Sequence, residues 1–357
     1  MIDCIEAQGF EKKYGARFLR GEEVCLFDFS KKFTEGWDWT WQMPRADFDH
    51  TLAKEIMRRG ADVEFGATVT DVRFTGTDSV TTVVDKDGNT YEWQAKFIID
   101  ASGFGRVLPR ILGLERPAVG LPDNSSVFVH AKDSRRPANR EGTLITFDIV
   151  KEKVWLWVIP FSDGTTSIGF VGPTDFVDDY GEDLHTALAE MMQLSDYYKD
   201  RFPPEEFLFT PRKIRNIAKA VTRLHGDGYA LTGNSAEFLD PVFSSGVTFA
   251  TESALRAAKL AARQLKGETI DWEQEYAAHI KSGMNTFATY VKEWYTGNLQ
   301  TLFFHRPENL ANKEKICAVL AGYVWDKSNP FVRKHKNIVK NMAHLLKIQA
   351  EAESVSG

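Results

Sequence analysis

The chain has 357 residues, 43% of them hydrophobic and 26% charged, with a formal net charge of −6 at pH 7. This length suggests about two domains, and the acidic balance argues against nucleic acid or an anionic membrane as the main partner. Three cysteines without a C-x-x-C pair and eight scattered histidines argue against a disulfide framework and a metal site. No apolar run reaches the roughly 18 residues of a membrane span, so we expect a cytoplasmic protein.

The N-terminal part of the chain alternates between helical and strand-like patterns. Residues 1–30 predict the end of a helix and then strands over Ala16–Leu19 and Val24–Phe29. Apolar residues then recur at helical spacing from Phe48 to Met57, and Gly60 stands where a helix commonly ends.

The middle of the chain is rich in strands. Asp87-Gly88 predicts a hairpin turn, and a buried strand ends at Asp100. Residues 125–171 carry four strand-like runs separated by turns, which predict a meander. A helical pattern covers residues 184–202, a strand returns at Tyr229–Thr232, and the chain is almost all helical after residue 247.

Residues 228–247 combine a strand, a tight turn and a helix start, which together predict a flavin site. A helix N-terminus offers unpaired N–H groups and a partial positive charge. These features suit an electron-rich group such as the edge of a reduced isoalloxazine. The candidate cofactor contacts are the turn, the Asp-Pro loop and the helix start: Gly233, Asn234, Asp240, Pro241, Ser244, Ser245 and Gly246.

Folds that bind a dinucleotide in this way normally open with a strand, G-x-G-x-x-G and a helix. Residues 1–18 of the printed sequence show no such glycines. A pyrophosphate cradle contributes roughly 5–10 kcal/mol through charge-assisted hydrogen bonds and the helix dipole. We therefore expect the chain as printed to hold FAD only in traces.

Three further motifs each have a structural as well as a functional interpretation. DASGFGR follows a strand, where open α/β sheets bind ligands, so Asp100 and Gly103 are candidate cofactor contacts, although a plain strand-end turn fits too. WLWVIP places Trp155 and Trp157 on one face of a strand, as a packed aromatic sheet also would. Lys13 lies at the edge of a predicted strand, where most lysines are solvated.

Taken together, these segments resemble the flavin-dependent halogenases, a branch of the class A flavoprotein monooxygenase superfamily. The resemblance spans nearly the whole chain and rests on KYGARF, MPRADFD, DASG, W-x-W-x-I-P and FLDPVFSSGV. The C-terminal WYTGNLQTLFF is similar to the branch that acts on phenolic, pyrrolic or carrier-bound substrates. The most specific motif is W-x-W-x-I-P, which is formed by Trp155, Trp157, Ile159 and Pro160.

The resemblance implies FAD as the cofactor, reduced by a separate flavin reductase. It implies that reduced FAD, dioxygen and a halide ion, chloride or bromide, yield hypohalous acid. Lys13 matches the family's tunnel lysine, so it is the expected catalytic residue, and a desolvated amine there would have a lowered pKa. The halide is expected to bind near Ser245 and Gly246. Arg45 and the turn that begins at Asp100 are expected to make further contacts with FAD.

Two departures from the family pattern concern the ligands. Asn234 stands where the family usually has aspartate, so this contact keeps a hydrogen bond but loses a charge. Phe243 replaces the glutamate of the tryptophan-specific branch, which argues against free tryptophan as substrate. The expected substrate is an aromatic small molecule or an aromatic group bound to a carrier protein.

The predicted fold is α/β: a Rossmann-like FAD/NAD(P)-binding domain lacking its N-terminal unit, an inserted β-sheet substrate domain and a helical C-terminal region. The expected segments are 1–110 for the partial FAD-binding domain, 111–225 for the substrate domain, 226–268 for the returning FAD-binding segment and 269–357 for the helical region. Two other functions fit the same residues. One is a hydroxylating monooxygenase or geranylgeranyl-reductase-like enzyme, and the other is a non-catalytic truncated homologue unable to hold FAD.

Overall fold

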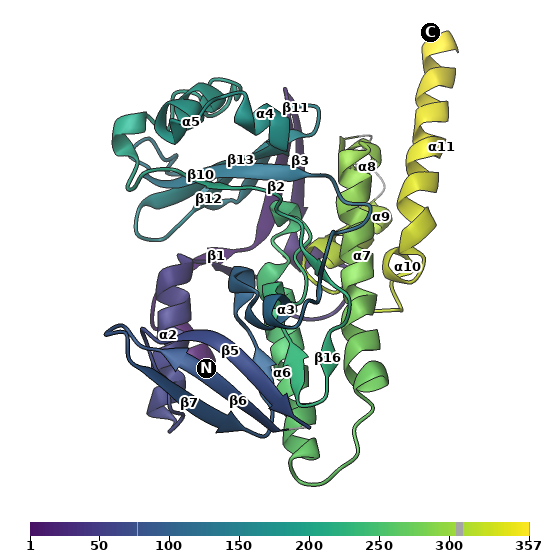
Figure 1. Ribbon diagram of the computed structural model, residues 1–357. Helices are drawn as coiled ribbons and strands as arrows, with labels where there is room; N and C mark the ends of the chain where they lie inside the picture. Colours follow the sequence, from purple (N-terminus) through teal and green to yellow (C-terminus); the bar gives the residue numbers. More distant parts are fainter. Residues whose placement is uncertain (77, 305–309, 357) are drawn as a thin grey trace. The chain divides into compact units, whose positions relative to one another are not determined.

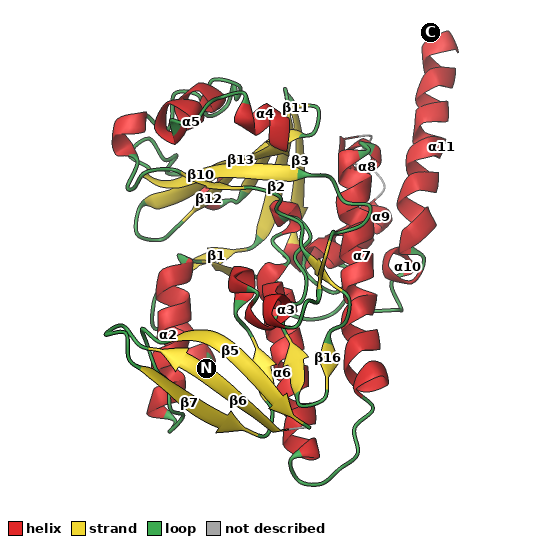
Figure 2. Ribbon diagram, in the orientation of Figure 1, coloured by secondary structure: helices red, strands yellow, loops and turns green. Residues whose placement is uncertain are grey.

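The computed structural model describes residues 1–76, 78–304 and 310–356. The chain divides into two compact units, and each unit is assembled from separate stretches of sequence. The first unit takes residues 1–63, 122–217 and those from 293 onward, and the second takes residues 64–121 and 218–292. Both helices and strands build the units, which confirms the predicted α/β class (Figures 1 and 2).

A seven-stranded sheet forms the centre of the first unit, in the order β14-β10-β13-β12-β11-β2-β3. Neighbouring strands are antiparallel except β11 and β2, which run parallel. The predicted meander supplies four of these strands. The bounds are β2 Gly15–Arg20, β3 Glu23–Asp28, β10 Asn124–Lys132, β11 Thr146–Lys151, β12 Val154–Pro160, β13 Thr165–Pro173 and β14 Arg212–Ile214.

One face of this sheet carries the core of the first unit. Apolar side chains of β10, β12 and β13 pack there against α5 (Leu184–Met192), which contributes Leu188 and Met191, both fully buried. Short α4 (Thr174–Asp178) lies beside the same strands (Figure 1). The helical pattern predicted over residues 184–202 ends ten residues early. After Met192 the hydroxyl of Ser195 donates to Asp148 and accepts from the amide of Tyr198, which forms a turn.

The remaining elements of the first unit lie at its two sequence ends. A two-stranded ribbon joins β1 to β4, and α2 ends before Gly60, which has φ of +92° as expected for a residue that follows a helix. The described C-terminal helices pack against each other, α10 on α9 and α11 on α8. The bounds are α1 Ile2–Glu6, β1 Glu11–Lys13, β4 Thr40–Gln42, α2 Arg45–Arg58, α8 Asn298–Phe304, α9 Leu310–Leu320, α10 Pro330–Arg333 and α11 His335–Ser356.

The second unit contains two three-stranded sheets. The antiparallel sheet β5-β6-β7 includes the predicted turn at Asp87-Gly88, where Gly88 has φ of +85°. The other three-stranded sheet has the order β16-β17-β8, with β17 and β8 parallel, and β15 pairs with β9 in a short two-stranded sheet. The bounds are β5 Thr68–Thr75, β6 Asp78–Val84, β7 Thr90–Ala95, β8 Ile98–Asp100, α3 Val107–Ile111, β9 Glu115–Arg116, β15 Ala220–Val221, β16 His225–Gly226, β17 Tyr229–Leu231, α6 Gly246–Gln264 and α7 Ala278–Tyr295.

The compact units divide the chain differently from the predicted segments. Residues 15–28, expected in the FAD-binding segment 1–110, add β2 and β3 to the sheet of the first unit because β2 pairs with β11. Residues 218–225, expected in the substrate segment 111–225, belong to the second unit. Such long-range strand pairing depends on tertiary packing, which hydrophobic periodicity does not specify. The boundaries of the functional domains stay a prediction.

Candidate functional site

In the second unit, two parallel strands bring the predicted cofactor-binding turns together. Leu231 at the end of β17 pairs with Asp100 at the end of β8, so both strands finish at the same edge. The backbone amide of Thr232 donates to the carbonyl of Asp100 at 2.9 Å. The loops that begin at Asp100 and Gly233 are therefore neighbours, in the position where open α/β sheets bind ligands.

The carboxylate of Asp100 shapes the turn that follows it. Its two oxygens accept the backbone amides of Ser102 at 2.7 Å and Leu108 at 2.8 Å, and the residue is buried. Gly103 has φ of +59°, and a Cβ there would meet no atom within 4 Å. Asp100 thus holds the loop in place, while Gly103 leaves its backbone open to an approaching group.

Arg106 is a positioning residue that the sequence did not reveal. Its buried guanidinium donates to the carbonyls of Asn234 at 3.2 Å, Ser235 at 3.3 Å and Ala220 at 2.8 Å, and it pairs with Glu115 at 2.8 Å. The backbone of Arg106 is left-handed, with φ of +47°. One side chain thereby joins the DASG loop to the Gly233-Asn234 turn. A left-handed backbone is uncommon at a residue other than glycine, so nothing in GFGR signalled this role in advance.

The Asp-Pro loop leads directly into helix α6. Asp240 accepts the amide of Val242 at 3.0 Å and starts the short helical turn Pro241–Phe243, after which Ser244 has φ of +52°. Helix α6 then starts at Gly246.

The start of α6 fits an electron-rich or anionic group. The side chain of the N-cap residue Ser245 makes no capping hydrogen bond to this helix of 19 residues, and the first N–H groups of a helix lack partners within the helix itself. Ser245 is buried, and Ser244 is exposed. A Cβ at Gly246 would lie 3.8 Å from the side-chain oxygen of Asn234. The predicted turn and helix start are therefore adjacent, as a flavin site requires.

In the first unit, Lys13 is a half-buried lysine at the end of β1. Desolvation lowers the pKa of its amine to about 8. Among the described residues no carboxylate forms an ion pair with Lys13. Its amine lies 5.7 Å from the centre of the Phe29 ring. An amine with this pKa is partly neutral near pH 7, so it can act as a nucleophile or as a hydrogen-bond donor.

The strand that faces Lys13 is tied to the tryptophan motif by a buried glutamine. Lys13 pairs with Thr40 on β4, and two residues later Gln42 donates to the carbonyls of Pro160 at 2.6 Å and Thr143 at 3.2 Å. The side-chain oxygen of Gln42 accepts the amide of Ile145 at 3.1 Å. Gln42 was not a predicted site residue, yet it links the catalytic candidate to Pro160.

The two motif tryptophans lie on the same face of β12, as predicted, with ring centroids 6.1 Å apart. Trp155 is 1% exposed, and its indole N–H donates to the hydroxyl of Tyr295 at 3.0 Å. Trp157 is half-buried and donates to the hydroxyl of Ser167 at 3.1 Å. A Cβ at Gly169 would lie 2.4 Å from the Trp157 ring, so glycine is needed beneath it. Trp157 is therefore the more accessible of the pair.

The other two residues of the W-x-W-x-I-P motif, Ile159 and Pro160, belong to the first unit, as does Arg45, a predicted FAD contact. Ile159 is half-buried and Pro160 is buried on β12. Arg45 is exposed at the start of α2, and it forms a two-point ion pair with Asp49 at 3.0 and 2.9 Å. To bind FAD, Arg45 would exchange this partner, so its cofactor role stays a prediction.

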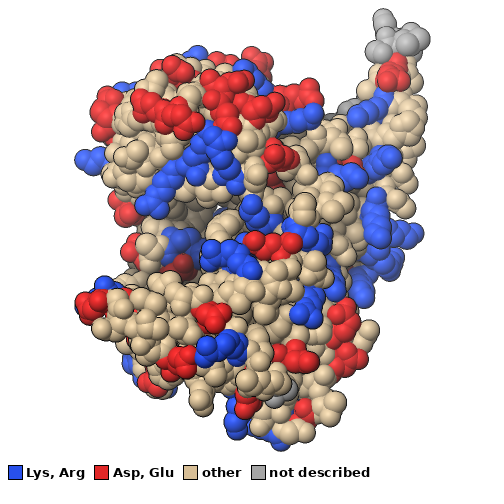
Figure 3. All heavy atoms as spheres, in the orientation of Figure 1, with Lys and Arg blue, Asp and Glu red and all other residues tan. Residues whose placement is uncertain are grey.

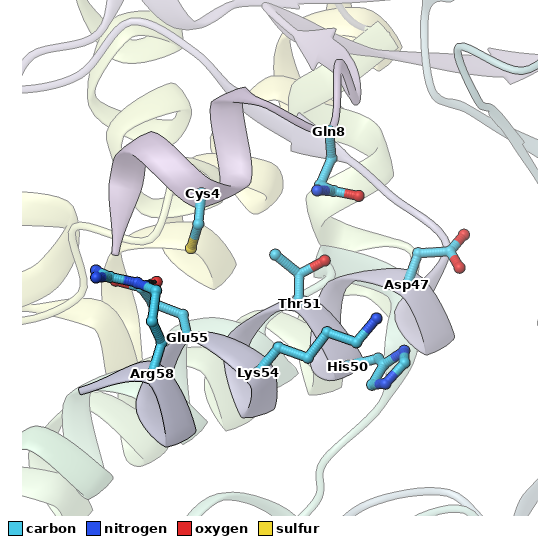
Figure 4. A pocket seen from close by; sticks show the side chains of 8 residues that line it. All are labelled: Cys4, Gln8, Asp47, His50, Thr51, Lys54, Glu55 and Arg58. Carbon is cyan, nitrogen blue, oxygen red and sulfur yellow. Dashed lines mark hydrogen bonds and ion pairs between the residues drawn. The ribbon is translucent and has the colours of Figure 1, made fainter. Parts of the chain in front are cut away.

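A surface groove in the first unit is lined by none of the predicted site residues. It has a volume of about 390 Å³ between α1 and α2, and Figure 4 shows its polar lining. Glu55 in this lining is held by Arg58 and Arg59, which lower its pKa to about 2. Glu55 and Arg58 in this lining therefore neutralise each other. The lining residues are Cys4, Gln8, Asp47, His50, Thr51, Lys54, Glu55 and Arg58.

Two absences concern the described residues only. In the ranges 1–76, 78–304 and 310–356, no cluster of histidine, cysteine, aspartate or glutamate has the arrangement of a metal site. Within the same ranges, no helix combines the length and apolar character that a membrane crossing needs.

The lowered pKa of Lys13 predicts a pH dependence. If the neutral amine accepts the halogen, product formed per flavin oxidised rises from pH 7 to pH 9, with a midpoint near the pKa of about 8. The measurement is the halogenated product against pH, with FAD reduced chemically so that no reductase limits the rate. A yield that falls above pH 8 would instead assign the ammonium form as a hydrogen-bond donor.

Comparison with known proteins identifies the family. The sequence model described as tryptophan halogenase matches residues 16–346. The chain belongs to this family. Flavin-dependent halogenases use FAD. The expected cofactor, FAD, and the expected enzyme class, a flavin-dependent halogenase, are therefore confirmed.

Two characterised relatives have different substrates. The 1H-pyrrole-2-carbonyl-[peptidyl-carrier protein] brominase of Pseudoalteromonas luteoviolacea (strain 2ta16) is 26% identical, over 80% of this chain and 71% of its own. The tryptophan 2-halogenase of Chondromyces crocatus is also 26% identical, over 87% of this chain and 60% of its own. Overall identity therefore does not distinguish a carrier-bound pyrrole from tryptophan.

A solved structure shares the fold of the chain closely. The flavoprotein/dehydrogenase from Cytophaga hutchinsonii is 49% identical, with a TM-score of 0.95 over 98% of this chain and 85% of that one. This similarity confirms the predicted fold, an FAD-binding domain combined with a β-sheet substrate domain.

Proposed function

We propose that this chain halogenates a phenolic or pyrrolic ring that a carrier protein presents as a bound acyl group. The observation that carries the proposal is Lys13, a desolvated amine tied through Gln42 to the strand of the W-x-W-x-I-P motif. Bound FAD supplies, with dioxygen and halide, an electrophilic halogen. In this proposal the cofactor is reduced by a separate flavin reductase in a reducing compartment such as the cytoplasm, where the three free cysteines stay unpaired.

Each group of residues has a separate task. The backbone around Gly103, the Gly233-Asn234 turn and the uncapped start of α6 would hold the flavin, with Asp100 and Arg106 fixing their loops. The N–H groups beside Ser245 and Gly246 would hold the halide.

The amine of Lys13 would carry the halogen to the ring. The neutral nitrogen attacks the halogen of hypohalous acid, a nitrogen–halogen bond forms, and water leaves after proton transfer from the amine. The aromatic ring then takes the halogen, and its ring proton returns to the nitrogen. Both steps balance without a further oxidant, and Lys13 ends as the free amine.

The substrate class follows from the surroundings of Phe243. This side chain is 6% exposed and packs against the rings of Phe287 and Tyr290, each with its centroid 6.4 Å away. No carboxylate stands at this position to take the ring proton of an indole. Phenols and pyrroles lose their ring proton readily after electrophilic attack, so they depend less on such a base.

A competition assay tests the proposed substrate class. Reduced FAD, dioxygen and bromide are supplied with equal concentrations of free tryptophan, a simple phenol and pyrrole-2-carbonyl bound to a peptidyl carrier protein. We expect brominated carrier-bound pyrrole or phenol to exceed brominated tryptophan by at least about tenfold, a difference of about 1.4 kcal/mol between transition states. Faster bromination of tryptophan than of every other substrate would contradict the role given to Phe243.

A further inference from the structure

The C-terminal part of this acidic chain contains a strongly basic block. Residues 327–347 contain six lysine and arginine residues and no aspartate or glutamate, although the whole chain carries a net charge of −6. Lys and Arg side chains gather over α10 and the first turns of α11 (Figure 3). All six are exposed: Lys327, Arg333, Lys334, Lys336, Lys340 and Lys347.

Helical spacing arranges part of this block as a line. Lys336, Lys340, His344 and Lys347 are separated by four, four and three residues on α11, so they form one stripe on the helix. This basic stripe extends for about 16 Å at the rise of an α-helix. A straight cationic line of this length matches three turns of a partner helix.

The basic stripe is exposed to solvent along one edge of the packed face of α11. Val339 and Ala343 are fully buried, and α11 contacts α8. None of the stripe's lysines forms an ion pair with a described residue, and Lys347 only donates to the side-chain oxygen of Asn298 at 3.3 Å. Other exposed cations of the chain do have acidic partners, for example Arg73 with Glu92. The cations of the stripe are therefore available for an external anionic surface.

A lipid surface fits this stripe less well than a protein surface. Membrane-bound amphipathic helices insert a broad apolar face, but the apolar face of α11 is occupied by α8. Among the described exposed apolar residues of α11, Ile348, 48% exposed, borders the stripe one turn after His344, whereas Leu345, 59% exposed, lies on the far side of the helix. A row of charges bordered by one apolar side chain has the composition of a polar protein interface.

We propose that the basic stripe docks an acidic helix of the carrier protein that presents the aromatic acyl group. This inference rests on the proposed function, in which a protein delivers the substrate. Charge complementarity would speed the encounter and orient the carrier, while Ile348 would contact an apolar residue of its helix. The stripe would then determine the KM for carrier-bound substrate and leave the chemistry on the ring unchanged.

The test compares two triple variants of the full chain. In the first, Lys336→Glu, Lys340→Glu and Lys347→Glu reverse the stripe. The control reverses three exposed lysines of the second unit that form no described ion pair: Lys86→Glu, Lys96→Glu and Lys266→Glu. Fluorescence anisotropy measures binding of a labelled peptidyl carrier protein loaded with pyrrole-2-carbonyl, at 50 and 300 mM salt. Circular dichroism checks that both variants fold.

We expect the stripe variant to bind the carrier about 10- to 100-fold more weakly at low salt, while the control keeps the affinity of the original chain. A milder variant with Lys→Gln at the same three positions should bind the carrier with an affinity between those of the stripe variant and the control. Equal loss in both triple variants, no loss in the stripe variant, or no binding of the carrier by the original chain would overturn the inference. The inference would also be overturned if the stripe bound phosphatidylserine vesicles, or mediated self-association of the chain, in place of binding the carrier.

Activity on a small substrate separates this inference from the proposed function. The N-acetylcysteamine thioester of pyrrole-2-carboxylate carries the same acyl group without a protein. If both variants halogenate it equally and the stripe variant alone has a raised KM for the carrier-bound form, the stripe is a docking surface. If the carrier binds through the stripe but neither pyrrole form is halogenated, the proposed function fails and the docking surface stands.

Discussion

When reduced FAD is supplied in excess, because the chain as printed is expected to hold FAD only in traces, replacing Lys13 by alanine is expected to abolish halogenation while FAD oxidation continues. The amine is the only group we assign to the transfer of the halogen, so its loss should lower halogenated product by about 10²- to 10⁴-fold, the usual effect of removing a catalytic group. Dioxygen consumption by reduced FAD should persist, because the residues proposed to bind the flavin belong to other segments of the chain. Mass spectrometry of the product and an oxygen electrode measure the two rates separately.

Lys12→Ala provides the matched control for this variant. Lys12 is the neighbouring residue on β1, it is exposed, and its amine lies 4.2 Å from the ring of Trp39. Successive residues of a strand point to opposite faces, so this change removes an amine from the other side of the ribbon. Unchanged product yield in Lys13→Ala, or equal losses in both variants, would disprove the catalytic assignment.

Replacing Arg106 by alanine is expected to destabilise the second unit and weaken FAD binding together. The change leaves the carbonyls of Asn234, Ser235 and Ala220 without their donor. Buried acceptors left unpaired cost about 1–3 kcal/mol each, and partial access of water reduces the sum, so we expect a loss of about 2–4 kcal/mol. Denaturant unfolding gives the free energy, and flavin fluorescence titration gives the affinity.

The control for this prediction is Arg110→Ala, on the same loop and helix. Arg110 is exposed and makes one long contact of 3.4 Å to the carbonyl of Arg106. Its removal should change the free energy of unfolding by no more than about 0.5 kcal/mol. If Arg106→Ala unfolds at the same denaturant concentration as Arg110→Ala, the loops do not depend on the buried guanidinium.

Local sequence signals predicted most elements and the grouping of several site residues. The hairpin at Asp87-Gly88, helix α2 before Gly60 and the pairing of Trp155 with Trp157 on one strand face were all predicted correctly. Each depends on short-range rules of turn geometry, helix termination and strand alternation. The start of α6 after the Ser-Ser-Gly turn was predicted within one residue for the same reason.

Only the tertiary structure decided how distant segments combine. The pairing of β2 with β11, the link from Gln42 to Pro160 and the three carbonyls held by Arg106 join residues about 110 to 130 positions apart. No periodicity encodes such contacts, because they depend on which strands pair and which polar groups are buried together. The sequence by itself thus determined the local elements and, through its motifs, the family. Tertiary packing determined the assignment of residues 15–28 to the seven-stranded sheet, the desolvation that lowers the pKa of Lys13 and the exposure of the basic stripe on α11.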